Sequence, residues 1–174
     1  MVIGDTQYSR NIFSFRWSNE EREAIGIYEV VFDNTNRKDG AYYNNTNQTF
    51  AFADGAVTAS YGSATALALA DVTVGDHVTP GLKSRHKEII KQQASSLLAT
   101  YDWYVVRKAD AGTAVPSAIT TYRAAVRTKS GEMEVLIDAC STVDELAALY
   151  QYVNTGTEEE PVMERPLGEF PEAV

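Results

Sequence analysis

Residues 97–127 have the sequence LLATYDWYVVRKADAGTAVPSAITTYRAAVR, and this stretch decides the expected fold of the C-terminal half. It joins an Asp102-Trp103 pair to a Tyr-Arg-Ala-Ala-Val-Arg segment that begins at Tyr122. Gly112 and Pro116 lie between these motifs, and both residue types interrupt regular structure. The stretch therefore predicts two helices joined by a connection over residues 100–116, with an extended piece at residues 103–106.

Apolar residues on both sides of this connection recur every three or four positions, as they do on the buried face of a helix. Before the connection, the stripe predicts a helix over residues 81–99. After it, a second helix is expected to begin near Pro116 or Ser117, because proline suits the first helical position. Gly131 is a point at which this second helix can bend. Its stripe consists of Ile119, Tyr122, Val126, Met133, Leu136 or Ile137, and Cys140.

A third, shorter helix is expected after residue 140. Residues 141–145, Ser-Thr-Val-Asp-Glu, contain the pattern of a capping box, in which a hydroxyl and a carboxylate satisfy the first backbone amides of a helix. Apolar residues then continue at helical spacing to Val153, and residues 154–156 end the helix.

The N-terminal half predicts short strands. Phe13, Phe15 and Trp17 alternate with polar residues, and Asp54-Gly55 between two apolar runs is a hairpin signal. Residues 18–26 predict a short helix with a capping box and a glycine stop, and residues 27–32 predict a further strand. We expect a small antiparallel sheet. The pattern of residues 61–78 is compatible with either a helix or a strand.

The last 18 residues, 157–174, contain six glutamates, one arginine and three prolines. Such a segment buries too little apolar surface to become ordered alone. It is either a disordered, solubilising end or a segment that docks on a neighbouring subunit, and we expect the second. The docking residues would be the apolar side chains spaced by the prolines, namely Val162, Met163, Leu167 and Phe170.

These patterns together predict an α+β fold in three parts. Residues 1–79 form a β-rich region, residues 80–154 a helical hairpin with a short third helix, and residues 155–174 an extended acidic tail. The apolar content of 44% and charged content of 22% fit a globular protein. No apolar run approaches the roughly 20 residues that span a bilayer, so we expect no membrane partner.

The composition also argues against several classes of function. A net charge of −9 disfavours nucleic-acid binding, which requires clustered cations. A closed zinc site needs four ligands, whereas His77 and His86 are the only histidines and stand apart from the single Cys140. A thiolate nucleophile would need a base that the sequence does not assign, and no phosphate-binding glycine loop is present. We therefore assign no catalytic, cofactor-binding or metal-binding residue and expect a protein that is not an enzyme.

The two motifs around the connection resemble the phage tail assembly chaperones, a family that includes tail-fibre assembly proteins. In that family one helix ends in Leu-Leu-x-x-x-Asp-Trp and a second begins near Tyr-Arg-x-x-x-Arg. The resemblance covers roughly residues 80–150, and short cyanophage tail-region proteins are the most similar in kind. The residues that carry it here are Leu97, Leu98, Asp102, Trp103, Tyr122, Arg123 and Arg127.

The resemblance implies a non-enzymatic protein that is made in the bacterial cytoplasm and binds a tail, tail-fibre or baseplate protein in an oligomeric assembly. We expect it to be retained in the tail region of the virion. Three alternatives stay open: an assembly chaperone that leaves before maturation, a tail-associated glycan hydrolase, and a host protein with a coincidental helix pair.

The motif residues themselves have two interpretations, which can both hold. In the structural one, Trp103 fills the junction between antiparallel helices, Asp102 caps a turn or pairs with an arginine, and Tyr122 packs in the seam. In the functional one, aromatic residues and arginines form a partner surface, because both are enriched at interface hot spots. The residues of that surface would be Trp103, Tyr104, Arg107, Tyr122, Arg123 and Arg127.

Overall fold

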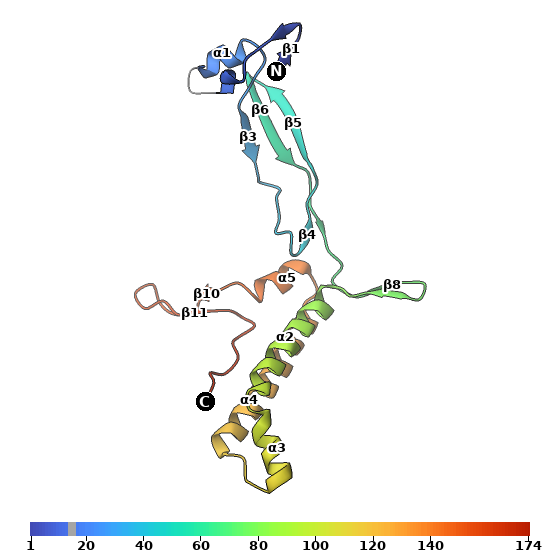
Figure 1. Cartoon of the computed structure of the whole chain (residues 1–174), viewed down its shortest axis with the longest axis vertical. Helices are drawn as coiled ribbons and strands as arrows, with labels where there is room; N and C mark the ends of the chain where they lie inside the picture. Colours follow the sequence, from blue (N-terminus) through green and yellow to red (C-terminus); the bar gives the residue numbers. More distant parts are fainter. Residues whose placement is uncertain (14–16) are drawn as a thin grey trace. The chain divides into compact units, whose positions relative to one another are not determined.

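The computed structural model describes residues 1–13 and 17–174, and the chain divides into two compact units, Met1–Thr65 and Ala66–Val174 (Figure 1). With 38% helix and 20% strand, the chain has the predicted α+β fold. The boundary between the units comes earlier than the composition change after residue 79, so residues 66–80 belong to the second unit.

The first unit consists of short strands and two short helices. Its elements are β1 (Val2–Ile3), β2 (Thr6–Gln7), the 3-10 helix η1 (Arg10–Phe13), α1 (Asn19–Glu23), β3 (Val30–Asp33), β4 (Tyr43–Asn44), β5 (Gln48–Ala53) and β6 (Ala56–Tyr61), and β7 (Thr65–Ala66) spans the boundary. The strand expected from Phe13 to Trp17 has its centre, residues 14–16, outside the described residues. At Phe13 itself the chain is in η1 instead of a strand.

A capping box starts α1, as the sequence predicted. The Ser18 hydroxyl accepts a hydrogen bond from the Glu21 amide at 3.2 Å, and the Glu21 carboxylate accepts one from the Ser18 amide at 2.8 Å. Gly26 follows with a φ of 81°, a left-handed conformation that lets the chain leave the helix and turn toward β3.

The main sheet of this unit has the strand order β3-β6-β5. The predicted hairpin is confirmed: β5 and β6 are antiparallel, and their two turn residues, Asp54 and Gly55, both have positive φ (52° and 78°). The expectation of a purely antiparallel sheet is wrong, because β3 pairs with β6 in parallel. A long connection separates these two strands, so alternation within each strand does not determine their relative direction.

The second unit is mainly helical. Its elements are β8 (Val72–Val74), β9 (His77–Thr79), α2 (Leu82–Ala99), α3 (Asp102–Ala111), α4 (Ser117–Ala139), α5 (Val143–Ala148), β10 (Val153–Asn154) and β11 (Met163–Glu164). The segment that the sequence left open, residues 61–78, is described throughout and contains strands, including the antiparallel hairpin of β8 and β9.

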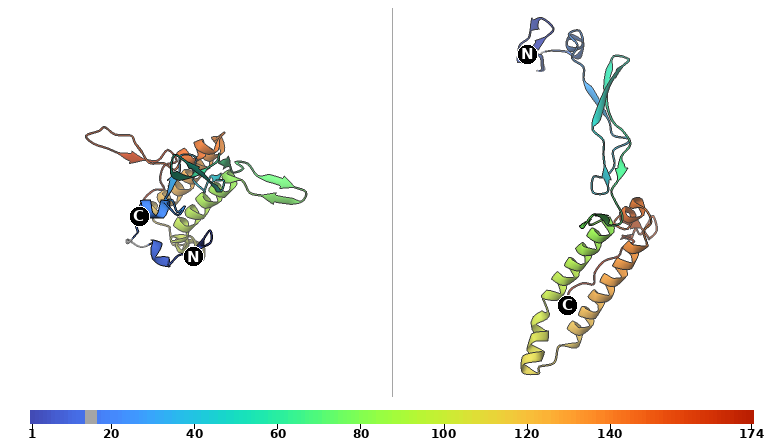
Figure 2. Two further views of the ribbon diagram at one scale, coloured as in Figure 1. Left: turned by 90° about the horizontal axis from the view of Figure 1, so that it is seen from above. Right: turned by 90° about the vertical axis from the view of Figure 1, so that its right-hand side faces the viewer.

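Helices α2 and α4 confirm the two predicted helices and run side by side over most of their length (Figure 2). Their apolar stripes face each other and form the core of the unit, in which Val126 and Met133 are fully buried. Burial of such a side chain contributes roughly 1.5–3 kcal/mol. Helix α4 is continuous through Gly131. None of the described helices combines the length and apolar character needed to cross a bilayer.

Ion pairs lie along one flank of this helix pair. Lys87 Nζ is 2.8 Å from a carboxylate oxygen of Asp138, and Lys91 Nζ is 3.4 Å from one of Glu134. Because these side chains are partly exposed, each pair contributes little, about 0–1 kcal/mol. The stripes therefore hold the two helices together, and the charges help to set their register.

Helix α3 corrects the expectation of an extended piece at residues 103–106. Asp102 favours the helix N-terminus electrostatically, and Gly112 ends the helix with a φ of 70°. Val105 and Val106 disfavour helix by only about 0.7 kcal/mol or less each. The two end signals outweigh that local preference.

Helix α5 has the predicted capping box, between Thr142 and Glu145, but is shorter than expected. It ends at Ala148, and Val153 lies in strand β10 instead of on the helix. After the helix, the carbonyl of Leu149 accepts a hydrogen bond from the Leu167 amide at 3.0 Å. The chain is thus held by the returning tail where the stripe alone predicted further helical turns.

The tail packs on helices of its own chain, in contrast to the expectation that a neighbouring subunit orders it. Leu167 is fully buried, and Phe170 packs against the core cluster around Tyr122. The Tyr101 hydroxyl donates to the Val174 carbonyl at 2.6 Å. These contacts supply the apolar burial that the acidic tail lacks by itself.

Candidate partner-binding surface on helix α3

One guanidinium group fixes the start of α3. Arg123, from α4, is 2.8 Å from a carboxylate oxygen of Asp102 and donates to the Leu98 carbonyl at 2.7 Å. Tyr122 is 4% exposed and contacts the Tyr101 ring edge-on, with 5.3 Å between the centroids. The predicted pairing of Asp102 and the predicted packing of Tyr122 are both confirmed.

Trp103 does not fill the helix junction, since it is 51% exposed. Its ring stacks on that of Tyr104, with 3.8 Å between the centroids, and the Arg107 guanidinium lies 4.8 Å and 5.2 Å from the two ring centres. We call these three residues the α3 aromatic cluster. Arg107 follows Tyr104 by three positions and Trp103 by four, on a helix of which no residue is buried.

The α3 aromatic cluster is ordered before any partner arrives. A cation–π contact at an exposed site contributes about 0.5–1 kcal/mol and restricts the long Arg107 side chain. The Nε–H of Arg107 has no hydrogen-bond acceptor among the described residues. A stacked guanidinium can still present its edge to a carboxylate. The cluster thus combines flat aromatic area with a guanidinium whose Nε–H is buried and, among the described residues, unpaired.

A groove of about 370 Å³ lies between α3, the α3–α4 connection and the first turns of α4, and none of the cluster residues lines it. We call it the α3 groove. Three of its lining side chains are cationic, although the whole chain carries a net charge of −9. Its residues are Val105, Lys108, Ala114, Val115, Thr120, Arg123 and Arg127. The groove therefore has the chemistry to receive an acidic segment with small apolar side chains.

The structure separates the expected partner-binding residues into groups. Trp103, Tyr104, Arg107 and Arg127 lie on the surface of α3 and the adjoining part of α4, whereas Arg123 is buried between the helices. Tyr122, Leu167 and Phe170 belong to the interior of the helical unit instead. Val162 and Met163 are about half exposed on the β10–β11 side of the unit and do not line the α3 groove.

Sequence reasoning missed Val105, Lys108 and Val115 as lining residues. The signal was available for two of them: Val105 and Lys108 are three residues apart and share a face with Asp102 only if the segment is a helix. The expectation of an extended piece concealed that spacing.

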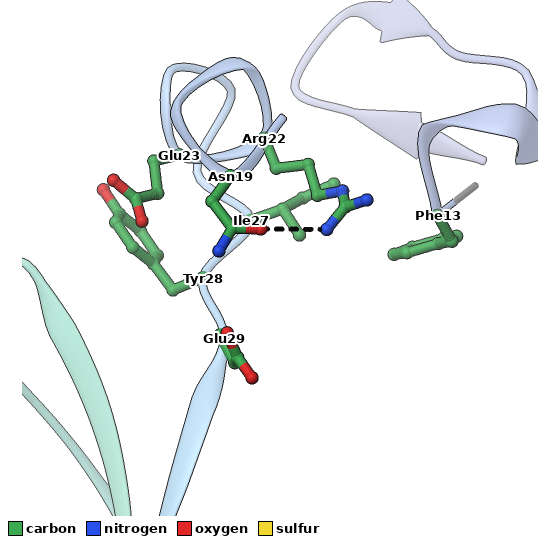
Figure 3. A pocket seen from close by; sticks show the side chains of 7 residues that line it. All are labelled: Phe13, Asn19, Arg22, Glu23, Ile27, Tyr28 and Glu29. Carbon is green, nitrogen blue, oxygen red and sulfur yellow. Dashed lines mark hydrogen bonds between the residues drawn. The ribbon is translucent and has the colours of Figure 1, made fainter. Parts of the chain in front are cut away.

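A second pocket, of about 490 Å³, lies in the first unit beside α1 (Figure 3). Arg22 crosses it and donates to the Asn19 side chain at 3.1 Å and to the Ile12 carbonyl at 2.9 Å. Glu23 and Tyr28 lie to one side of Arg22 and Phe13 to the other. The arginine thus ties η1 to α1, and the pocket presents no pair of groups set up for a reaction.

Two further titratable groups, Cys140 and His86, are held in their neutral forms. Burial raises the pKa of the Cys140 thiol and lowers the pKa of His86, so the thiol stays protonated and the imidazole neutral near pH 7. The described residues contain no group of three or more His, Cys, Asp or Glu side chains that could hold a metal ion.

The chain matches no family model, no curated protein and no solved structure. The relationship to phage tail proteins therefore stays a prediction from the motif residues around α3 and α4.

Proposed function

We propose that this protein is a non-enzymatic component of a phage tail that binds another tail, tail-fibre or baseplate protein through α3 and is retained in the virion. The observation that carries the binding role is the aromatic stack on the surface of α3, in which Trp103 is exposed and Tyr104 and Arg107 are partly exposed. Aromatic residues and arginine are the residue types that dominate interface energetics. Side chains that are already ordered lose less entropy on binding.

The chemistry of the partner follows from the α3 groove. Lys108 and Arg127 favour a segment that carries carboxylates, and the aromatic cluster on the same helix as Lys108 favours an apolar or aromatic anchor. We therefore expect the partner to present an acidic segment with one large apolar residue.

The phage assignment rests on the motif residues. Asp102 and Arg123, which are shared with the phage tail assembly chaperones, form the ion pair at the base of α3, and Tyr122 packs beside it. If that resemblance reflects ancestry, the same junction supports the same partner surface. This reasoning supports the assignment to tail assembly and names no specific partner.

A dissociable assembly chaperone is the second candidate, and the small size of the surface favours it. A single ten-residue helix and its groove offer less area than a permanent interface usually buries. Such a protein would cover its client until the client oligomerises. A glycan hydrolase is the rival from another class, and sustained turnover of purified host envelope by this chain would favour it.

The test is quantitative mass spectrometry of density-purified, salt-washed phage particles that encode this chain. A whole-number ratio of the chain to the tail-tube subunit supports the retained component. Absence from particles together with abundance in the lysate indicates the chaperone. Particles that assemble normally after deletion of the gene would overturn both.

Variants connect this readout to α3. Trp103→Ala should weaken partner binding by about 2 kcal/mol, as truncation of a hot spot does, and should deplete the chain from particles. Val135→Ala is the matched control, because Val135 is an apolar α4 residue with 68% exposure that lies outside the α3 groove. Equal depletion of both variants would remove α3 from the proposal.

A further inference from the structure

The β3-β6-β5 sheet of the first unit has one apolar face. Strand register aligns Phe32 with Ala59 and Phe50, and aligns Val30 with Val57 and Phe52. Residues that pair directly across strands project to the same side of a sheet. We call this side the Phe face, and its members are Val30, Phe32, Gln48, Phe50, Phe52, Val57, Ala59 and Tyr61.

The Phe face is exposed although it is rich in aromatic rings. Phe32, Phe50 and Phe52 are 60–65% exposed. The Tyr28 ring packs on Phe52, with 4.6 Å between the centroids, and thus extends the aromatic surface beyond the start of β3. The largest apolar patch on a typical monomer is roughly 300–600 Å² and is often functional. Three phenylalanines on one small sheet, each more than half exposed, form a patch of that kind.

The opposite face of the sheet differs in character. Thr49, Thr58, Ser60 and Asp33 lie there with Val31 and small alanines. An antiparallel or mixed sheet with one apolar and one polar face is one layer of a two-layer structure. Among the described residues, the other sheets have two strands of two or three residues each, which is too little to form the second layer.

We propose that the second layer is the same sheet of another copy of this chain, packed Phe face to Phe face in a two-fold dimer. A two-fold interface brings identical patches together, so it disfavours patches that carry charge. None of the eight Phe-face residues carries a charge at neutral pH. The Arg37 guanidinium lies 5.9 Å from the Tyr61 ring, at the end of the face. Two equal sheets also match in width and pack about 10 Å apart.

The available area agrees with a dimer of moderate strength. A phenylalanine offers roughly 150–250 Å², so three of them at this exposure present on the order of 300–450 Å² per copy. Both copies together, with the flanking valines and tyrosines, reach about 1,000 Å², near the lower limit for specific interfaces. We therefore expect a dissociation constant in the micromolar range. This inference concerns the first unit and is independent of the function proposed for α3.

The test is sedimentation equilibrium of the full chain across the micromolar range. The wild-type chain should change from monomer to dimer as its concentration rises. Phe50→Lys, which places a charge on the Phe face beside Ala59 of the central strand, should remain monomeric with unchanged far-ultraviolet circular dichroism. Val31→Lys is the matched control, because Val31 is an exposed apolar residue of the opposite face, and this variant should dimerise like the wild type.

A second measurement covers the case in which Phe50→Lys fails to fold. In an equimolar mixture of isotope-labelled and unlabelled wild-type chains, nuclear Overhauser effects should connect the Phe50 ring of one copy with Val57 methyl groups of the other. A wild-type chain that stays monomeric throughout, or a dimer that persists in folded Phe50→Lys, would overturn the proposal.

Discussion

A carboxylate oxygen of Asp102 lies 2.8 Å from Nη1 of Arg123, and the two side chains differ sharply in exposure, 58% against 10%. The same Arg123 nitrogen donates to the carbonyl of Leu98 at the end of α2. One guanidinium thus joins α2, α3 and α4. Because the arginine is buried and the aspartate is not, the two partners should contribute unequally to stability.

Arg123→Met should lower the free energy of unfolding by about 2–3 kcal/mol, because it removes the charge-assisted hydrogen bond to the Leu98 carbonyl, which keeps only backbone donors such as the Tyr101 amide, and removes packed side-chain volume. Asp102→Asn should cost less than about 1 kcal/mol, since its partner keeps the carbonyl contact and solvent reaches the site. Urea denaturation of both variants measures the difference. Arg127→Met, one turn further along α4 at an exposed position, is the control and should change stability by no more than about 0.5 kcal/mol. Equal losses from Arg123 and Asp102 would contradict this asymmetry.

Helices α2 and α4 were predictable because a stripe of apolar residues marks each of them. Ile119, Tyr122, Val126 and Met133 were assigned to the core from spacing alone, and all four are buried. Helix α3 was missed because its exposed face carries the large residues, so no buried stripe marks it. Its determinants are local, at Asp102 and Gly112. The low helix preference of Val105 and Val106 masks them in the sequence.

Other features depend on contacts that no local pattern encodes. Leu167 and Phe170 were identified as anchors of the tail, but composition indicates only that the tail needs an apolar surface, not whose surface it is. The parallel pairing of β3 with β6 likewise depends on contacts that no local pattern encodes. Alternation gives the faces of a strand, whereas its direction and neighbour depend on the path of the whole chain.

Gly168 holds the tail in its path on the helices. Its φ of 77° is left-handed, and a Cβ atom there would stand 2.5 Å from Nζ of Lys129. The lysine end can move, so the main cost of Gly168→Ala is the backbone conformation, about 1–2 kcal/mol. Faster limited proteolysis of residues 157–174 and lower thermal stability should follow.

Gly131→Ala is the control for this substitution. Gly131 lies inside α4 with nothing within 4 Å of its Cβ position, so alanine there should stabilise the helix by about 1 kcal/mol. The two glycine-to-alanine changes should therefore have opposite signs. A stabilised or unchanged Gly168→Ala would mean that the tail does not depend on the left-handed turn.

Gly81 permits a close approach at the start of α2. Its amide donates to the Asp71 carboxylate at 2.8 Å, and the next amide, of Leu82, donates to the Ala68 carbonyl at 2.9 Å. A Cβ atom on Gly81 would overlap the carbonyl group of Ala70, which is backbone and cannot yield easily. Gly81→Ala should cost about 1–3 kcal/mol, as overpacking does.

Hydrogen exchange locates that effect. The amides of Leu82 and Lys83 should lose protection in Gly81→Ala, while amides in the middle of α4 keep theirs relative to global stability. Gly40→Ala is the control, because no atom lies within 4 Å of its Cβ position. Unchanged protection at Leu82 would show that the preceding segment does not cap the helix.

His86 should make the fold sensitive to mild acid. Burial lowers the pKa of this imidazole from its ordinary value of 6.5, and its ring packs on Tyr150 at 4.8 Å between centroids. Between the folded and unfolded pKa values the unfolded chain binds the extra proton, so the free energy of unfolding falls as pH drops below about 6.5. The pKa of Asp71 is lowered mainly by its hydrogen bond with Ser84. Because the ordinary pKa of an aspartate is 3.8, protonation of Asp71 reduces the free energy of unfolding only at more acidic pH.

His86→Gln should flatten the upper part of this dependence and leave the lower part in place. Denaturation curves at intervals from about pH 8 to pH 3 cover the range in which an ordinary histidine titrates and the more acidic range in which Asp71 adds its loss. His77→Gln is the control, since His77 is an exposed residue of β9. If both variants keep the wild-type slope, the buried imidazole is not its source, and another group must bind the proton when the helical unit unfolds.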